Sequence, residues 1–135
     1  MLYDADCGLC VWLVSLLLAW DRRGLVRPCA IQGERAQGLL SDLGPEARLS
    51  SWHLISPDGG RSSGGAAFAP LLRLLPGGAP GAAVTSAAPG LSERGYRWVA
   101  DHRSALSRLV PARSKLWAQD VVGRAEAEPG PGRPR

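Results

Sequence analysis

Apolar and polar residues follow one another in blocks that predict a mixed α/β fold. Residues 1–3 are typical of a strand, and the apolar run after them predicts a largely buried helix over residues 6–20, with Asp6 as its N-cap. Residues 25–31 are typical of a second strand, and residues 34–43 carry apolar positions at helical spacing. The chain therefore opens with a strand–helix–strand unit.

The second half of the pattern predicts a hairpin and further helices. Residues 52–56 and 61–63 flank the turn sequence Pro57-Asp58-Gly59-Gly60, which favours an antiparallel pair of strands. Residues 66–75 and 91–110 have helical periodicity, and the Gly, Pro and Ala between them indicate a long connection over residues 76–90. The pattern predicts a domain over residues 1–110 and a largely disordered extension over residues 111–135, whose last eleven residues are rich in Pro and Gly.

Composition and charge limit the class of protein. The 135 residues fit one domain, and an apolar fraction of 45% excludes a fully disordered chain. Residues 1–90 carry seven Arg and seven Asp or Glu, so the net charge of +4 arises entirely from residues 91–135. A solvated helix and a basic tail account for that charge, so we expect no nucleic-acid partner. This solvated face would include Arg94, Arg97, Arg103 and Arg108.

The location of the protein follows from its apolar segments. The longest strongly apolar run, residues 11–20, is half the length of about 20 residues that a membrane-spanning helix needs. Asp4 and Asp6 stand where a signal peptide would carry positive charge. We therefore expect no membrane span and a cytoplasmic location, where paired cysteines are more often catalytic or metal-binding than structural.

Cys7 and Cys10 form the strongest local motif, a Cys-x-x-Cys at the start of the first predicted helix. Side chains three residues apart on a helix lie on one face, so the two sulfurs can close a disulfide with little backbone movement. The positive end of the helix dipole lowers the pKa of the first thiol, which becomes the attacking thiolate, and the second thiol can resolve a mixed disulfide.

Two carboxylates and a third cysteine accompany this motif. Asp4 and Asp6 oppose the lowering of the thiol pKa, because a nearby negative charge disfavours the thiolate. Asp4 is either a proton shuttle for Cys10 or a solvated residue at a strand end. Cys29 is either a small buried apolar residue or a third redox thiol, if the second strand ends near Cys10.

A metal site is the alternative use of the cysteines. Zinc normally takes four ligands, and beyond the motif the chain offers only Cys29, His53 and His102, each placed singly. His53 lies inside a predicted strand and is interpreted as a packed residue, and His102 as a solvated one. We therefore expect neither a metal nor an organic cofactor.

The opening of the chain resembles a known family. The sequence Tyr3-Asp4-Ala5-Asp6-Cys7-Gly8-Leu9-Cys10 is similar to the signature of the DCC family (DUF393), the predicted thiol–disulfide oxidoreductases, with Ala5 in place of the usual Gly. The similarity extends over about residues 2–110, through the Pro57-Asp58-Gly59 turn. The resemblance implies a thioredoxin-like fold, with a small mixed sheet flanked by helices and an extra C-terminal helix before the tail.

The resemblance also implies an activity. A thiol–disulfide oxidoreductase would exchange the Cys7–Cys10 dithiol with the disulfide of a protein or small molecule, tuned by Asp4 or Asp6, and would need an external redox partner. The alternatives are a non-catalytic thioredoxin-like module that senses redox state or binds a protein, and a metal-binding module. No oligomeric state follows from the sequence.

Overall fold

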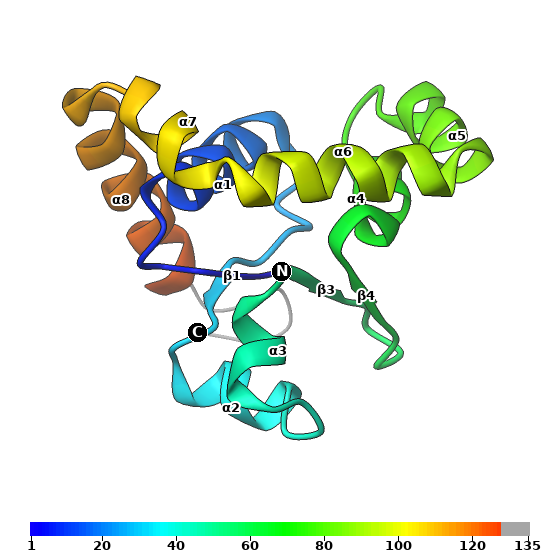
Figure 1. Ribbon diagram of the computed structural model, residues 1–135, viewed down its shortest axis with the longest axis horizontal. Helices are drawn as coiled ribbons and strands as arrows, with labels where there is room; N and C mark the ends of the chain where they lie inside the picture. The colour runs from blue at the N-terminus through cyan, green and yellow to red at the C-terminus, as the bar shows by residue number, and fades with distance from the viewer. Residues whose placement is uncertain (128–135) are drawn as a thin grey trace.

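A four-stranded mixed sheet runs through the middle of the protein, described by a computed structural model over residues 1–127 (Figure 1). Its strands are β1 (Leu2–Tyr3), β2 (Cys29–Ala30), β3 (His53–Ile55) and β4 (Arg61–Ser63). The order is β2-β1-β3-β4, with β1 and β2 parallel and the other two pairings antiparallel. The predicted mixed sheet, with its parallel crossover and its hairpin, is therefore confirmed.

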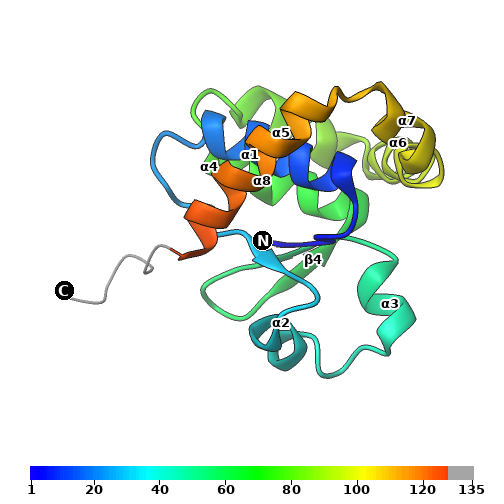
Figure 2. The ribbon, with the colours of Figure 1, turned by 90° about the vertical axis from the view of Figure 1, so that its left-hand side faces the viewer.

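Helices cover both faces of this sheet. They are α1 (Gly8–Trp20), α2 (Glu34–Leu39), α3 (Pro45–Leu49), the 3₁₀ helix η1 (Gly64–Ala67), α4 (Phe68–Leu74), α5 (Ala79–Ala87), α6 (Pro89–Asp101), α7 (Arg103–Leu109) and α8 (Ala112–Ala127). Figures 1 and 2 show α2 and α3 on one side of the sheet and the other α-helices on the opposite side. None of the helices within residues 1–127 is long and apolar enough to cross a membrane.

The core consists of three clusters of buried side chains, which the sheet and α1 connect. One joins β1 and α1 to α8, a second joins β3 to η1 and α4, and a third lies between the sheet and α2. The buried members are, in order, Tyr3, Val11, Val14, Ala118 and Val122; Val26, Leu54, Ala67, Leu71 and Leu75; Leu2, Ile31, Ala36 and Leu40. The dithiol turn thus joins a strand and a helix that are both anchored in the core.

The second strand is shorter than predicted. Only Cys29–Ala30 forms the strand β2 within the predicted range 25–31. Pro28 has no N–H to give to a ladder, so pairing starts at Cys29, whose N–H donates to the carbonyl of Met1 at 2.9 Å. Ile31 continues the pairing with an N–H donated to the carbonyl of Tyr3 at 2.9 Å. The register of the β1–β2 pair is therefore fixed at both ends.

The long connection predicted over residues 76–90 contains helix α5 and the start of α6. Each of these helices has a proline in its first turn, where the missing N–H costs nothing, and α5 is rich in alanine, the strongest helix former. The helix predicted over residues 91–110 is interrupted at His102, which separates α6 from α7. The Gly/Pro/Ala composition was therefore misleading here.

The C-terminal extension also differs from the prediction. Residues 112–127, predicted to be largely disordered, form α8, which packs against α1 through the buried side chains of Ala118 and Val122. The carboxylate of Glu126 accepts hydrogen bonds from the Tyr3 hydroxyl at 3.1 Å and from the Ala30 N–H at 2.8 Å. This helix therefore belongs to the folded domain. The rest of the predicted tail, residues 128–135, lies outside the described residues.

Candidate active site

The Cys-x-x-Cys lies in the turn that leads from β1 into α1. Cys7 has extended backbone angles and is the N-cap of α1, and its Sγ accepts a hydrogen bond from the Cys10 N–H at 3.3 Å. This bond satisfies one of the free N–H groups of the first helical turn. The prediction that Asp6 is the N-cap is therefore wrong, because the helix begins one residue later than Asp6 could cap.

The two thiols have opposite pKa shifts. The pKa of Cys7 is lowered from 9.0 to about 6, mainly by the hydrogen bond from the Cys10 side chain, with help from the Cys10 N–H and the charge of Arg103. The pKa of Cys10 is raised, because its proton is held in that same bond and because its thiol is buried. At neutral pH the pair therefore consists of a thiolate at Cys7 and a thiol at Cys10.

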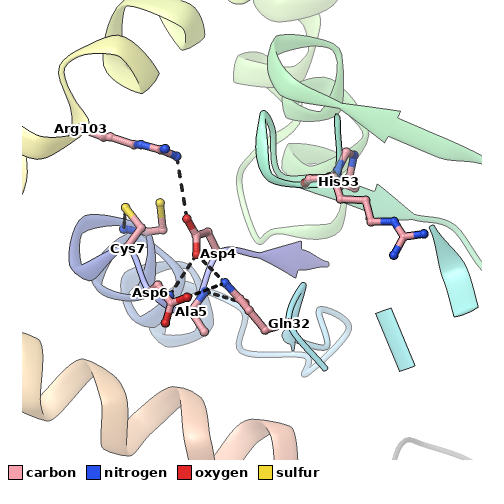
Figure 3. A network of polar contacts seen from close by, with 9 residues as sticks. Asp4, Ala5, Asp6, Cys7, Gln32, His53 and Arg103 are labelled. Carbon is pink, nitrogen blue, oxygen red and sulfur yellow. Dashed lines mark hydrogen bonds and ion pairs between the residues drawn. The ribbon is translucent and has the colours of Figure 1, made fainter. Parts of the chain in front are cut away.

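Asp4 is held beside the dithiol by contacts from three directions (Figure 3). Its Oδ1 accepts hydrogen bonds from the Gln32 side chain at 2.7 Å and from the Asp6 N–H at 3.0 Å. Its Oδ2 lies 3.8 Å from the guanidinium of Arg103, and only 18% of its side chain is exposed. The negative charge of Asp4 raises the pKa of both thiols, and Arg103 opposes it. Asp4 is therefore a fixed charge at the site.

Gln32 and Arg103 belong to this network, although the sequence pattern does not single them out. Gln32 follows β2 and also accepts a hydrogen bond from the Ala5 N–H at 3.2 Å, and it donates to the carboxylate of Asp6 at 3.2 Å. Arg103, assigned from sequence to a solvated face, begins α7 and reaches back to Asp4 (Figure 3). The only sequence signal for Arg103 was its place in the segment that resembles the DCC family.

A small polar pocket opens in front of Cys7. It has a volume of about 270 Å³ and is lined by Asp4, Asp6, Cys7, Gly8, Arg103, Ser104 and Ser107. The thiolate of Cys7 thus faces polar side chains from the loop after β1 and from α7. A group that enters this pocket would therefore meet Cys7 directly.

Cys29 lies away from the dithiol. It pairs with Leu2 in the β1–β2 ladder, and its side chain packs beside the cluster that contains Ile31. The charges near it are Glu126, Arg35 and the N-terminal amine, none of which acts on Cys7 or Cys10. Burial raises the pKa of the Cys29 thiol. The structure therefore does not bring the possible third thiol into the site.

The two histidines have local partners. His53 is buried, and its ring nitrogens are hydrogen-bonded to the Ser63 hydroxyl at 2.7 Å and to the Arg48 carbonyl at 3.0 Å. His102 is exposed and stacks on the Trp98 ring, with 4.6 Å between ring centroids. Among residues 1–127, no three His, Cys, Asp or Glu side chains come together as a possible metal site.

Comparisons with known proteins bear on the same part of the chain. A family model described as DCC1-like thiol-disulfide oxidoreductase matches residues 1–109. No curated protein and no solved structure matches the chain. The matched region contains the dithiol turn together with Asp4, Gln32 and Arg103, and it ends before α8.

Proposed function

The chain belongs to the DCC1-like thiol-disulfide oxidoreductase family, and we propose that it exchanges its Cys7–Cys10 dithiol with a substrate disulfide. Family membership supports a general thiol–disulfide redox role. The observation that supports the specific assignment is the position of Cys7 as the N-cap of α1, where its Sγ accepts a hydrogen bond from the Cys10 N–H, together with the opposite pKa shifts of the two thiols. Exchange requires a thiolate that attacks and a second thiol that resolves the mixed disulfide, and the opposite shifts support this division of roles.

The proposed reaction has two exchange steps. The Cys7 thiolate attacks one sulfur of the substrate disulfide, so that a Cys7–substrate disulfide forms and the other substrate sulfur leaves as a thiolate and takes up a proton. Cys10 then loses its proton and attacks the Cys7 sulfur, which closes the Cys7–Cys10 disulfide and releases the second substrate thiol. Two electrons pass to the substrate, and an external thiol reductant restores the dithiol.

Asp4 and Arg103 have complementary parts in this proposal. The charge of Asp4 acts on Cys10, both residues line the same cavity, and in this proposal Asp4 takes the proton of Cys10 in the second step, the shuttle role that the sequence suggested. Arg103 stabilises the thiolate of Cys7. Asp6 holds Gln32 in place and is a positioning residue. We place the protein in the cytoplasm, where thiol reductants keep such a pair reduced.

The test is to trap the intermediate with serine variants. We expect Cys7→Ser to abolish reduction of a model disulfide, and Cys10→Ser to accumulate a mixed disulfide at Cys7 that mass mapping identifies. Cys29→Ser is the matched control and should keep wild-type rates. Equal activity in wild type and Cys7→Ser would exclude the motif as the active centre. A single turnover without further cycles, when reductant is in excess, would favour the redox-sensing module instead.

A further inference from the structure

A second, larger cavity lies on the other side of the Asp4–Arg103 pair. Its volume is about 650 Å³, within the range of small-molecule sites. Its walls are mainly apolar side chains of α1, α4 and α6, among them Leu9, Leu13, Leu17, Leu71, Leu72 and Val99. A site of this size and lining favours a ligand with an apolar body.

The polar groups of this cavity fall into two sets. Three of its hydroxyls donate to backbone carbonyls, Ser51 to Trp52, Thr85 to Gly81 and Ala82, and Ser92 to Thr85 and Ala88, and the Tyr3 hydroxyl donates to the Glu126 carboxylate. The other set consists of Asp4, Cys10 and Arg103, which belong to the dithiol site. The body of a ligand would therefore find few polar partners other than Tyr96, and its reactive group would lie at the dithiol.

Charge selects the kind of reactive group. Asp4 and Arg103 line both the large cavity and the small pocket in front of Cys7, so the two spaces adjoin at this pair. Because the Asp4 carboxylate lies 3.8 Å from the Arg103 guanidinium and the Cys7 thiolate adjoins this pair, this end of the cavity has no excess positive charge to hold an anionic head group. A neutral, polarisable disulfide suits such an end. The guanidinium of Arg103 would stabilise the negative charge of the leaving thiolate when the sulfur–sulfur bond breaks.

Building on the proposed function, we propose that the substrate is a small disulfide whose apolar body lies in the large cavity and whose sulfur–sulfur bond reaches past the Asp4–Arg103 pair into the pocket in front of Cys7. The Cys7 thiolate attacks the nearer sulfur, and the farther sulfur leaves as an apolar thiolate beside Arg103 and is protonated. Cys10 then displaces the remaining half as a second thiol. One apolar disulfide and one protein dithiol thus give two apolar thiols and the Cys7–Cys10 disulfide.

The first experiment compares two model disulfides in the presence of excess reductant. Di-n-butyl disulfide carries the apolar body, and bis(2-hydroxyethyl) disulfide is its polar counterpart. Each kcat/KM is divided by the rate of the same disulfide with free dithiothreitol, which removes the intrinsic difference in reactivity. We expect the normalised value to be about tenfold higher for the butyl compound, because burying its extra methylenes favours binding. Equal normalised values would overturn the assignment.

The second experiment fills the cavity. Gly95 in α6 lines it, and a Cβ at Gly95 would meet no atom within 4 Å, so Gly95→Leu extends a side chain without a backbone clash. Gly90 lies in the same helix with equally open surroundings but does not line the cavity, so Gly90→Leu is the matched control. We expect Gly95→Leu to remove the tenfold preference for the butyl compound and Gly90→Leu to retain it.

A binding measurement separates this inference from the proposed function. Di-n-butyl sulfide, an unreactive thioether, is titrated by calorimetry into Cys7→Ser, which cannot exchange. We expect saturable binding that Gly95→Leu weakens about tenfold. Absence of exchange with both disulfides would contradict the proposed function, whereas exchange without thioether binding would overturn the cavity assignment alone. Two further outcomes would overturn the cavity assignment and identify another occupant. One is a dimer of the wild-type protein that Gly95→Leu dissociates, and the other is reduction of an unfolded protein's disulfide at a higher kcat/KM than that of di-n-butyl disulfide.

Discussion

The small pocket at Cys7 and the large cavity at Cys10 share Asp4 and Arg103, yet they differ in almost every other wall. The pocket is bounded by polar residues of the β1–α1 loop and α7, and the cavity by apolar side chains of α1, α4 and α6. Two thiols three residues apart therefore face different surroundings. The comparison teaches that the β1–α1 turn sets the spacing of the two thiols, whereas helices distant in sequence give Cys7 polar surroundings and Cys10 apolar ones.

This difference also explains the uniformly apolar sequence of α1. Val11 packs against α8, Leu9, Leu13 and Leu17 line the cavity on another face, and Val14 contributes to both. A helix with apolar surroundings on two sides needs apolar residues around most of its circumference. The prediction of a largely buried helix holds only in part, since Leu13 and Trp20, which both line the cavity, remain 44% exposed.

The largest expected effect concerns how much the side chains that line the cavity and the pocket contribute to the stability of the fold. Leu71 is 5% exposed and belongs to the cluster with Val26 and Leu54, so we expect Leu71→Ala to lower the free energy of unfolding by about 2–4 kcal/mol. Ser107 lines the polar pocket, and we expect Ser107→Ala to change it by less than about 0.5 kcal/mol. Urea denaturation measures both variants. Equal losses in the free energy of unfolding for the two variants would contradict this difference between the cavity and the pocket.

The next effect concerns the pH dependence of the two thiols. Because the thiolate is the reactive form and the pKa of Cys7 is about 6, its alkylation by iodoacetamide should fall about tenfold from pH 7 to pH 5 and change little from pH 7 to pH 8. Mass spectrometry of the Cys7 peptide follows the rate. Cys29, whose pKa is raised, is the internal comparison, and its rate should still rise between pH 7 and pH 8. A Cys7 profile parallel to that of Cys29 would contradict the assigned pKa.

The smallest effects concern Asp4 and Arg103, the two residues that line both the pocket and the cavity. Arg103→Gln removes a charge that lowers the pKa of Cys7, so alkylation of Cys7 at pH 6 should slow by about twofold. Asp4→Asn removes a charge that raises it, so the same rate should increase by about 1.5-fold, because half of the Cys7 thiol is already ionised at pH 6. Arg108→Gln in α7 is the control, because Arg108 lines neither the pocket nor the cavity. Shifts in the same direction for both variants would exclude opposing electrostatic roles.

The sequence predicted the features that local signals encode. The turn Pro57-Asp58-Gly59-Gly60 located the β3–β4 hairpin, and the Cys-x-x-Cys located the start of α1. The cap itself was not predictable, because the choice between Asp6 and Cys7 depends on which residue takes the extended backbone angles. Sulfur is also an unusual acceptor at that position.

Features that depend on contacts distant in sequence were missed. The buried face of α8 consists of Ala118 and Val122, two small side chains, whereas the larger Leu116 and Trp117 are exposed, so the order of apolar residues does not reveal the face that packs on α1. Gln32 and Arg103 act on Asp4 across 28 and 99 positions of the chain, and no local spacing encodes either contact. The asymmetry of the dithiol therefore had to be found in three dimensions.

The hydrogen bonds that the Glu126 carboxylate accepts from Tyr3 and Ala30 have a consequence for the order in which the protein folds during synthesis. Chains are synthesised from the N-terminus and begin to fold as they emerge from the ribosome. The β1–α1 turn with its two thiols is therefore made first, whereas α8, which covers Val11 and Val14, is translated only after the whole of residues 1–111. Until α8 has been made and Glu126 has bound Tyr3 and Ala30, the nascent chain carries its Cys-x-x-Cys motif on an uncovered apolar helix.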